Sequence, residues 1–108
     1  IGYGIRALDS GHDRIPTVSL RSVPRQVAVT VHRIERGGPF PYPADDGVVF
    51  HNYEHLLPAE PNGYYHEYTV PTQGSPDRGA RRIVTAKGGT FYYTPDHYGT
   101  FERLALSQ

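Results

Sequence analysis

Residues 64–70 have the sequence Tyr64-Tyr65-His66-Glu67-Tyr68-Thr69-Val70, which is typical of a β-strand. Aromatic and β-branched side chains predominate in it, and polar residues alternate with them. Stretches of similar character follow in residues 80–86, 90–94 and 100–106, and turn residues separate them. The second half of the chain therefore predicts a small sheet whose strands are joined by short turns.

One helix is expected before this sheet, over residues 24–36. Apolar residues recur from Val27 to Ile34 at spacings of four and three, which matches the helical period. Two glycines and Pro39 end the pattern. A further short strand is expected in residues 17–20. One helix followed by a run of strands indicates an α+β fold, in which the helix packs on a small antiparallel sheet.

The chain has 108 residues, a length that suits one compact domain. We expect residues 1–16 to form an arm or linker, because glycines and a proline interrupt them and their apolar residues show no period. Residues 17–108 are expected to form a single domain. Since the sequence starts at Ile1 without a signal peptide, we expect it to have been cut from a precursor or a larger protein.

The composition excludes several classes of protein. Eleven Lys and Arg balance eleven Asp and Glu, so a strongly basic polyanion-binding protein is not the expected class. The absence of cysteine excludes disulfides, thiolate metal sites and a thiol nucleophile. No apolar run approaches the ~20 residues that span a bilayer, so no membrane segment is expected.

A long loop is expected over residues 37–62, where prolines recur, and long loops in compact domains are usually functional. It contains Glu54, with Asn52, Phe50 and Tyr53 close by in the sequence. The carboxylate could accept two N–H donors from a guanine edge while an aromatic ring covers the face of the base. The alternative is a loop anchored by Phe50 whose polar groups bond to its own backbone.

Two residues of the predicted sheet are candidates for proton transfer. Glu67 lies within the strand of residues 64–70, where a rigid platform would hold its carboxylate as a general base. His97 lies in a turn bounded by Pro95 and Gly99, where an imidazole can donate or accept a proton near neutral pH. The alternatives are a solvated carboxylate on a strand face and one ordinary histidine among six.

Three arginines, Arg78, Arg81 and Arg82, fall within five residues. Arg78 is expected in a turn, and Arg82 is expected on the strand face opposite Arg81. If Arg78 and Arg82 converge, their guanidiniums would bind a phosphate through several charge-assisted hydrogen bonds. The alternative is a solvated basic edge strand that opposes aggregation.

Together these side chains form the set that RNA cleavage without a metal requires. Glu67 would take the ribose 2′-OH proton, the arginines would hold the phosphoryl oxygens, and His97 would protonate the departing 5′-oxygen. His51 and His55 have a spacing that suits a metal, but no third ligand is evident. We therefore expect no metal and no cofactor.

Five motifs carry a resemblance to a known family. They are Gly38-Pro39-Phe40-Pro41-Tyr42, Asp46-Gly47-Val48-Val49-Phe50, Gly63-Tyr64-Tyr65-His66-Glu67-Tyr68-Thr69-Val70, Arg78-Gly79-Ala80-Arg81-Arg82-Ile83 and Asp96-His97-Tyr98. Their order and spacing resemble those of the small secreted guanyl-specific ribonucleases of streptomycetes, the ribonuclease Sa type. These enzymes belong with barnase and the fungal guanyl ribonucleases in one superfamily. The similarity runs from about Val18 to Phe101.

The resemblance implies a role for each candidate residue. It places the general base at Glu67, the general acid at His97 and the phosphate-binding arginines at Arg78 and Arg82. It places guanine recognition at Glu54, and the remaining binding positions at Phe50, His51, Asn52, Tyr53, Tyr98 and Tyr42. The implied reaction forms a 2′,3′-cyclic phosphate on guanosine, which water then opens to the 3′-phosphate.

The chain departs from the family pattern in three places. The streptomycete enzymes carry a disulfide between the first strand and the C-terminus, where this chain has Ser19 and the region of Gln108. Such a bridge would contribute roughly 3–5 kcal/mol. His51 and Tyr53 stand where close relatives carry Gln and Arg, and Tyr53 could lie over the base as in the fungal branch. The part of the arm before about Asp13 has no counterpart in the family and is expected to be a linker or leader.

The family resemblance leads to one main hypothesis and two alternatives. The main hypothesis is a secreted, monomeric endoribonuclease that cuts single-stranded RNA after guanosine. The same domain could instead be the toxic C-terminal module of a larger protein delivered into target cells. The third hypothesis is an RNA-binding module without catalysis. The resemblance also implies a barstar-like acidic protein inhibitor, which would present carboxylates to Arg78, Arg82 and His97.

Overall fold

The computed structural model describes residues 14–106, so most of the expected arm, residues 1–13, lies outside the described part. Ile15 is buried and packs in one of the two core clusters. The guanidinium of Arg103 also donates a hydrogen bond to the Ile15 carbonyl, at 3.1 Å. The domain therefore includes residues 14–16, which the sequence assigned to the arm, because an apolar side chain there completes the core.

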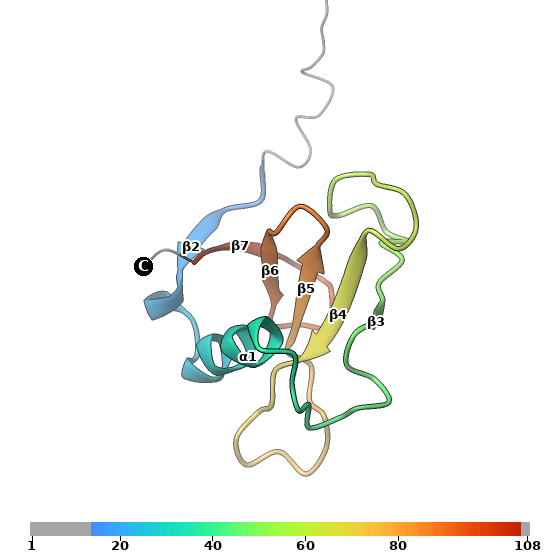
Figure 1. Ribbon diagram of the computed structural model, residues 1–108. Coiled ribbons are helices and arrows are strands. Elements are labelled where there is room, and N and C mark those ends of the chain that lie inside the picture. Colours follow the sequence, from blue (N-terminus) through green and yellow to red (C-terminus); the bar gives the residue numbers. More distant parts are fainter. Residues whose placement is uncertain (1–13, 107–108) are drawn as a thin grey trace, which may run out of the picture.

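Within the described residues, six strands form one sheet in the order β2-β7-β6-β5-β4-β3 (Figure 1). The strands are β2 (Thr17–Ser19), β3 (Val48–Val49), β4 (Tyr65–Thr69), β5 (Arg82–Ala86), β6 (Phe91–Thr94) and β7 (Glu102–Ala105). Neighbours from β3 to β7 are antiparallel, as expected, but β2 pairs with β7 in parallel. The sheet is therefore mixed, because no short turn joins these two distant strands and sets their direction.

Helix α1 (Arg25–Glu35) lies across one face of the sheet (Figure 1), which confirms the expected helix. A short 3-10 turn, η3 (Leu20–Ser22), precedes it. After the helix, Gly37 takes a left-handed φ of 83°, and the Gly38 N–H bonds to the Arg33 carbonyl. Glycine adopts this conformation without strain and so ends the helix. Within the described residues, no helix is both long and apolar enough to cross a membrane.

The core consists of two clusters, one on each face of the sheet. The cluster under α1 contains Val27, Val31, Val70, Ile83, Tyr93 and Leu104. The cluster on the opposite face contains Ile15, Leu57, Tyr65, Val84, Tyr92 and Phe101. Consecutive residues of β5 and β6 fall in different clusters, as the alternation of side chains along a strand requires. The loop after β3 therefore packs on the face that α1 leaves open.

Candidate active site

Strand register brings four polar side chains to the sheet face opposite α1. Glu67 pairs with Val84, whose side chain belongs to the cluster on that face. In the next row, Thr69 pairs with Arg82, and Arg82 pairs with Thr94. Directly paired residues of antiparallel strands point to the same face, and so do residues two apart on one strand. Three different strands therefore place a carboxylate, a guanidinium and two hydroxyls side by side.

Arg82 is a buried cation, with only 3% of its surface exposed. Its Nη1 donates to the carbonyls of Gly79 and Arg81, at 3.0 and 2.8 Å. Its Nε is buried and has no hydrogen-bond partner among the described residues. A buried donor without a partner is costly, and a charged one more so. The geometry thus presents a fixed guanidinium that an anion would satisfy.

Arg78 and Arg82 both lie next to Thr69. Its Nε and Nη2 both donate to the Thr69 hydroxyl, at 3.1 and 2.9 Å, and Thr69 is the strand partner of Arg82. The guanidinium also lies over the ring of Tyr42, 5.8 Å from its centre, and Asp45 forms an ion pair with it at 3.7 Å. The structure therefore brings the two predicted phosphate-binding arginines together and places Tyr42 beside one of them.

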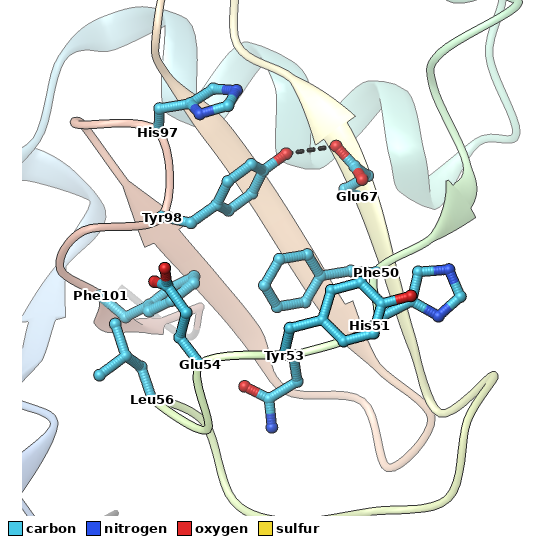
Figure 2. A pocket seen from close by; sticks show the side chains of 10 residues that line it. Phe50, His51, Tyr53, Glu54, Leu56, Glu67, His97, Tyr98 and Phe101 are labelled. Carbon is cyan, nitrogen blue, oxygen red and sulfur yellow. Dashed lines mark hydrogen bonds between the residues drawn. The ribbon is translucent and has the colours of Figure 1, made fainter.

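The hydroxyl of Tyr98 donates a hydrogen bond to Oε1 of Glu67 (Figure 2). Burial raises the pKa of this hydroxyl well above its ordinary value, and the bond to Glu67 and the charge of that carboxylate raise it further. The charge of Arg82 acts in the opposite direction. Tyr98 therefore stays protonated at neutral pH and holds one oxygen of the Glu67 carboxylate.

His97 and Tyr98 lie in a turn with two consecutive left-handed residues, at φ 56° and 75°. Such angles are uncommon for residues other than glycine and mark functional sites when the surroundings enforce them. The Tyr98 N–H bonds to the Thr94 hydroxyl at 3.0 Å, and the Asp96 carboxylate accepts from both Thr94 and Thr100. The ring of His97 is exposed and lies 4.8 Å from that of Tyr98.

A cavity of about 360 Å³ joins this turn to β4 and to the loop after β3. It is lined by Phe50, His51, Asn52, Tyr53, Glu54, Leu56, Glu67, His97, Tyr98 and Phe101 (Figure 2). Eight of these ten residues are sequence-predicted site residues. Arg78, Arg82 and Tyr42 do not line it. Arg82 is close enough to Tyr98 for its charge to act on that hydroxyl, and Arg78 bonds to Thr69, the strand partner of Arg82. Three separate segments of the chain thus enclose one cavity that offers a carboxylate and an imidazole.

The side chain of Asn52 bonds to the backbone of its own loop. Asn52 has a left-handed φ of 57°, and its amide bonds to both the carbonyl and the N–H of Leu57, at 3.0 and 3.1 Å. Both ends of the amide thus bond to the backbone of the same loop, so this side chain shapes the loop that lines the cavity.

Other residues of this loop present a carboxylate and aromatic rings to the cavity. Figure 2 shows the Glu54 carboxylate on the side of the cavity where Tyr98 and Phe101 lie. The Phe50 ring stacks on Tyr98, with the ring centres 4.8 Å apart. Tyr53 stacks on His51 at 5.0 Å and is 80% exposed. A flat ligand thus has aromatic surfaces and a carboxylate within one cavity.

Several positioning residues were missed in the sequence. Oδ1 of Asp46 accepts from the Thr69 N–H at 2.7 Å and Oδ2 accepts from the Tyr42 N–H at 3.1 Å, which ties the loop before β3 to β4. Thr69 then holds Arg78, and Thr94 holds the turn. No repeating pattern marks these residues, because they act through hydrogen bonds whose partners lie at different spacings, such as 4 residues for Thr94 and Tyr98 and 23 for Asp46 and Thr69. Within residues 14–106, no three His, Cys, Asp or Glu side chains gather as metal ligands.

Comparisons with known proteins agree with this arrangement. The family model described as ribonuclease matches residues 7–105. Guanyl-specific ribonuclease Sa3 of Kitasatospora aureofaciens is 56% identical over 88 residues, which are 81% of this chain and 62% of that protein. The chain thus spans under two thirds of the length of Sa3. Guanyl-specific ribonuclease St of Saccharopolyspora erythraea is 52% identical over 89 residues, covering 82% of this chain and 86% of St.

Solved structures give the same result. Ribonuclease Sa2 in complexes with mononucleotides superposes with a TM-score of 0.83 at 47% identity, over 87% of this chain and 97% of that one. Ribonuclease Sa2 with guanosine-2′-cyclophosphate superposes with a TM-score of 0.82 at 46% identity, over 87% and 99%. Sequence and fold agree over most of the chain, and it belongs to the ribonuclease family, with the guanyl-specific enzymes of the Sa type.

Proposed function

We propose that this ribonuclease cuts single-stranded RNA after guanosine, by a metal-independent reaction through a 2′,3′-cyclic phosphate. The observation that carries the proposal is the shared cavity, which Glu67, His97 and Glu54 all line. The relatives are guanyl-specific ribonucleases, and the similar Sa2 structures contain guanosine-2′-cyclophosphate and 3′-GMP. The toxin-module and non-catalytic alternatives are not needed to explain these matches.

In the first step, Glu67 accepts the proton of the ribose 2′-OH, and the 2′-oxygen attacks phosphorus in line. Tyr98 holds one carboxylate oxygen, so the other is left to take the proton. His97 protonates the departing 5′-oxygen of the next nucleotide. In the second step the roles reverse: His97 takes a proton from water, the hydroxide opens the cyclic phosphate, and Glu67 returns its proton to the 2′-oxygen.

The arginines stabilise the charge that develops on the phosphoryl oxygens. Arg82 offers a buried Nε without a partner, and Arg78 is fixed by Thr69 close to it. Donors that are already oriented need no reorganisation during the reaction, which makes them effective in a site shielded from water. The pair therefore contributes to the transition state more than two solvated arginines would.

Guanine recognition falls to the loop of residues 50–54. The Glu54 carboxylate accepts from two N–H donors on the edge of the base, and the backbone at Asn52 faces its carbonyl edge. Aromatic rings at Phe50 and Tyr53 cover the faces of the base. Adenine lacks this donor pair on the same edge, so it would leave the carboxylate without partners.

Product mapping on an RNA of mixed sequence tests this proposal. Mass spectrometry should find fragments that end in guanosine 2′,3′-cyclic phosphate early and guanosine 3′-phosphate later, at equal rates with and without EDTA. Ends distributed over all four bases would overturn the guanine assignment. Loss of cleavage in EDTA would overturn the metal-independent mechanism.

The same site suits an acidic protein inhibitor of the barstar type. Arg78 is partly exposed, His97 lines the open cavity and the buried Arg82 adds its positive charge, so carboxylates of a partner would be attracted to this region in place of phosphate. We propose such an inhibitor, together with export of the enzyme as a monomer. Titration of GpC cleavage with a barstar-like protein tests the pairing, and Arg82→Ala should weaken inhibition. Undiminished cleavage at excess inhibitor would contradict it.

A further inference from the structure

A second cavity, of about 470 Å³, adjoins the first across the loop of residues 50–54. The two cavities share the lining residues Phe50, His51 and Tyr53, so the loop forms a common wall. The second cavity has its own polar lining from Glu60 and Asn62. None of the proposed catalytic residues lines it. It therefore adjoins the proposed guanine site and is separate from the reacting groups.

The common wall is an aromatic surface that the protein holds in place. His51 and Tyr53 are stacked with an angle of 15° between their rings, and Tyr53 is 80% exposed. Nδ1 of His51 lies 2.7 Å from Oδ1 of Asn62, which fixes the imidazole from the other side of the cavity. Stacked, fixed and exposed rings are the surfaces on which proteins bind the bases of single-stranded nucleic acids.

The polar groups of the second cavity favour a base over a phosphate. The charge of Glu60 reaches the Tyr65 hydroxyl, where it helps to raise the pKa of that tyrosine after the larger effect of burial. A carboxylate there repels phosphate and accepts from the amino group of a base. Because Oδ1 of Asn62 is engaged by His51, its amide N–H remains to donate to a ring nitrogen.

We propose that the second cavity binds the base of the nucleotide on the 5′ side of the guanosine. This inference rests on the proposed function and names a further subsite of the same enzyme. His97, which protonates the departing 5′-oxygen, lines only the first cavity, so the nucleotide on the 3′ side leaves from that end. The nucleotide on the 5′ side of the guanosine then extends in the other direction, across the loop of residues 50–54 to the second cavity. Adenine fits best, since it offers a large stacking face, an amino group and a ring nitrogen.

Cleavage of three short substrates tests the subsite: GpC, ApGpC, and a trinucleotide with an abasic sugar in place of the adenosine. The wild-type enzyme should cut ApGpC with a kcat/KM about tenfold above the other two, the lower end of what stacking of one base provides. The abasic substrate keeps the additional phosphate, so it separates a contact to the base from a contact to the backbone.

Two variants locate the effect. Glu60→Ala and Asn62→Ala should both remove most of the preference for ApGpC. Glu60→Ala should leave kcat/KM for GpC unchanged, whereas Asn62→Ala also removes the contact that fixes His51. Glu35→Ala is the matched control, because it removes an exposed carboxylate from helix α1 on the other sheet face. A general gain in RNA affinity from the loss of a negative charge would appear in this control as well.

Equal cleavage of ApGpC and the abasic substrate by the wild-type enzyme would overturn the subsite. So would a fall in GpC cleavage that matches the fall for ApGpC in both variants. A preference for GpCpA that Asn62→Ala abolishes would place the 3′ nucleotide in the cavity and contradict the assignment. Failure of the proposed function gives a different result, since GpC itself would then remain uncut and the subsite would fall with it.

Discussion

Glu67 and Tyr98 form the pair that orients the proposed base. The tyrosine keeps its donor proton because its pKa is raised by burial and by the neighbouring carboxylate. It remains protonated through the whole range in which RNA is stable. It also touches the Phe50 ring and follows His97 directly in the chain. Tyr98 thus links the proposed general base Glu67, the proposed general acid His97 and the Phe50 ring that lines the cavity.

Tyr98→Phe should lower kcat for GpC about ten- to a hundredfold, the range for loss of a hydrogen bond to a charged group. The ring and its stacking on Phe50 are kept, so KM should change little. Steady-state kinetics measure both. A change confined to KM would show that Tyr98 binds the nucleotide and does not position Glu67.

Asp45 is a carboxylate that pairs with Arg78, one of the two proposed phosphate-binding arginines. Its Oδ2 lies 3.7 Å from Nε of Arg78, at a half-exposed site where one ion pair is worth little. It competes with a phosphate for the guanidinium, so Asp45→Asn should lower KM for GpC about two- to fivefold at low salt. The gain should fade as salt rises. An unchanged or higher KM in low salt would contradict this competition.

Asn52 and Glu54 show what residue types alone can predict. Both were expected to face the base, and the sequence gives them equal standing as polar residues of one loop. The structure separates them, because the left-handed backbone at Asn52 turns its amide onto Leu57. Which polar groups a loop uses for itself depends on backbone angles, and sequence periodicity does not report them.

The turn between β6 and β7 is the element that positions the imidazole. Its shape comes from the Asp96 carboxylate, which accepts from the hydroxyls of Thr94 and Thr100 and from the Thr100 N–H. Burial acts to raise the pKa of Asp96, but these hydrogen bonds outweigh it and the pKa is lowered. The carboxylate therefore stabilises the folded state in its ionised form.

Asp96→Asn should destabilise the protein at pH 7, and the difference from wild type should shrink as the pH falls. A lowered folded-state pKa gives stability that is present above the unfolded value of 3.8 and is lost as the folded carboxyl takes up its proton below it. Thermal unfolding between pH 2 and 7 measures the difference. A constant difference across this range would show that the ionised carboxylate has no special role.

The elements themselves were largely predictable. The helix and the strands β4 to β7 lie within the predicted ranges, each one to two residues shorter at one or both ends. Their periods are local properties of the sequence. The parallel pairing of β2 with β7 was not predictable in this way, since it joins residues 17–19 to residues 103–105. Strand β3 was also missed, because two residues carry no period.

The two faces of the sheet have different roles in the molecule. The cluster under α1 is distant from the site, whereas the opposite cluster supports the loop of residues 50–54 through Leu57. Leu57 is buried and also holds both ends of the Asn52 amide with its backbone. Changes in the two clusters should therefore have equal effects on stability and different effects on function.

Leu57→Ala and Ile83→Ala form a matched pair for this division. Each removes a buried aliphatic side chain, so each should lower the free energy of unfolding by about 2–5 kcal/mol in urea. Only Leu57→Ala should also raise KM for GpC, measured where both variants remain folded. An equal rise in KM for Ile83→Ala would show that the two clusters are not separate in function.

The meeting of distant segments was expected from chemistry and resemblance, but its geometry was not. The sequence offered a base, an acid, two cations and a base-binding loop from separate stretches. Only the register of Thr69 with Arg82 and the turn after Thr94 explain how they converge. Such register follows from the packing of the whole sheet, which no single segment encodes.

The proton-transfer role of Glu67 is tested most directly by Glu67→Gln. The amide has nearly the same shape and can still accept from Tyr98, but it cannot take a proton from the ribose. With the fold intact by circular dichroism, kcat/KM for GpC transphosphorylation should fall by a factor on the order of 10²–10⁴. Cleavage of GpC near the wild-type rate would contradict the assignment of Glu67 as the base.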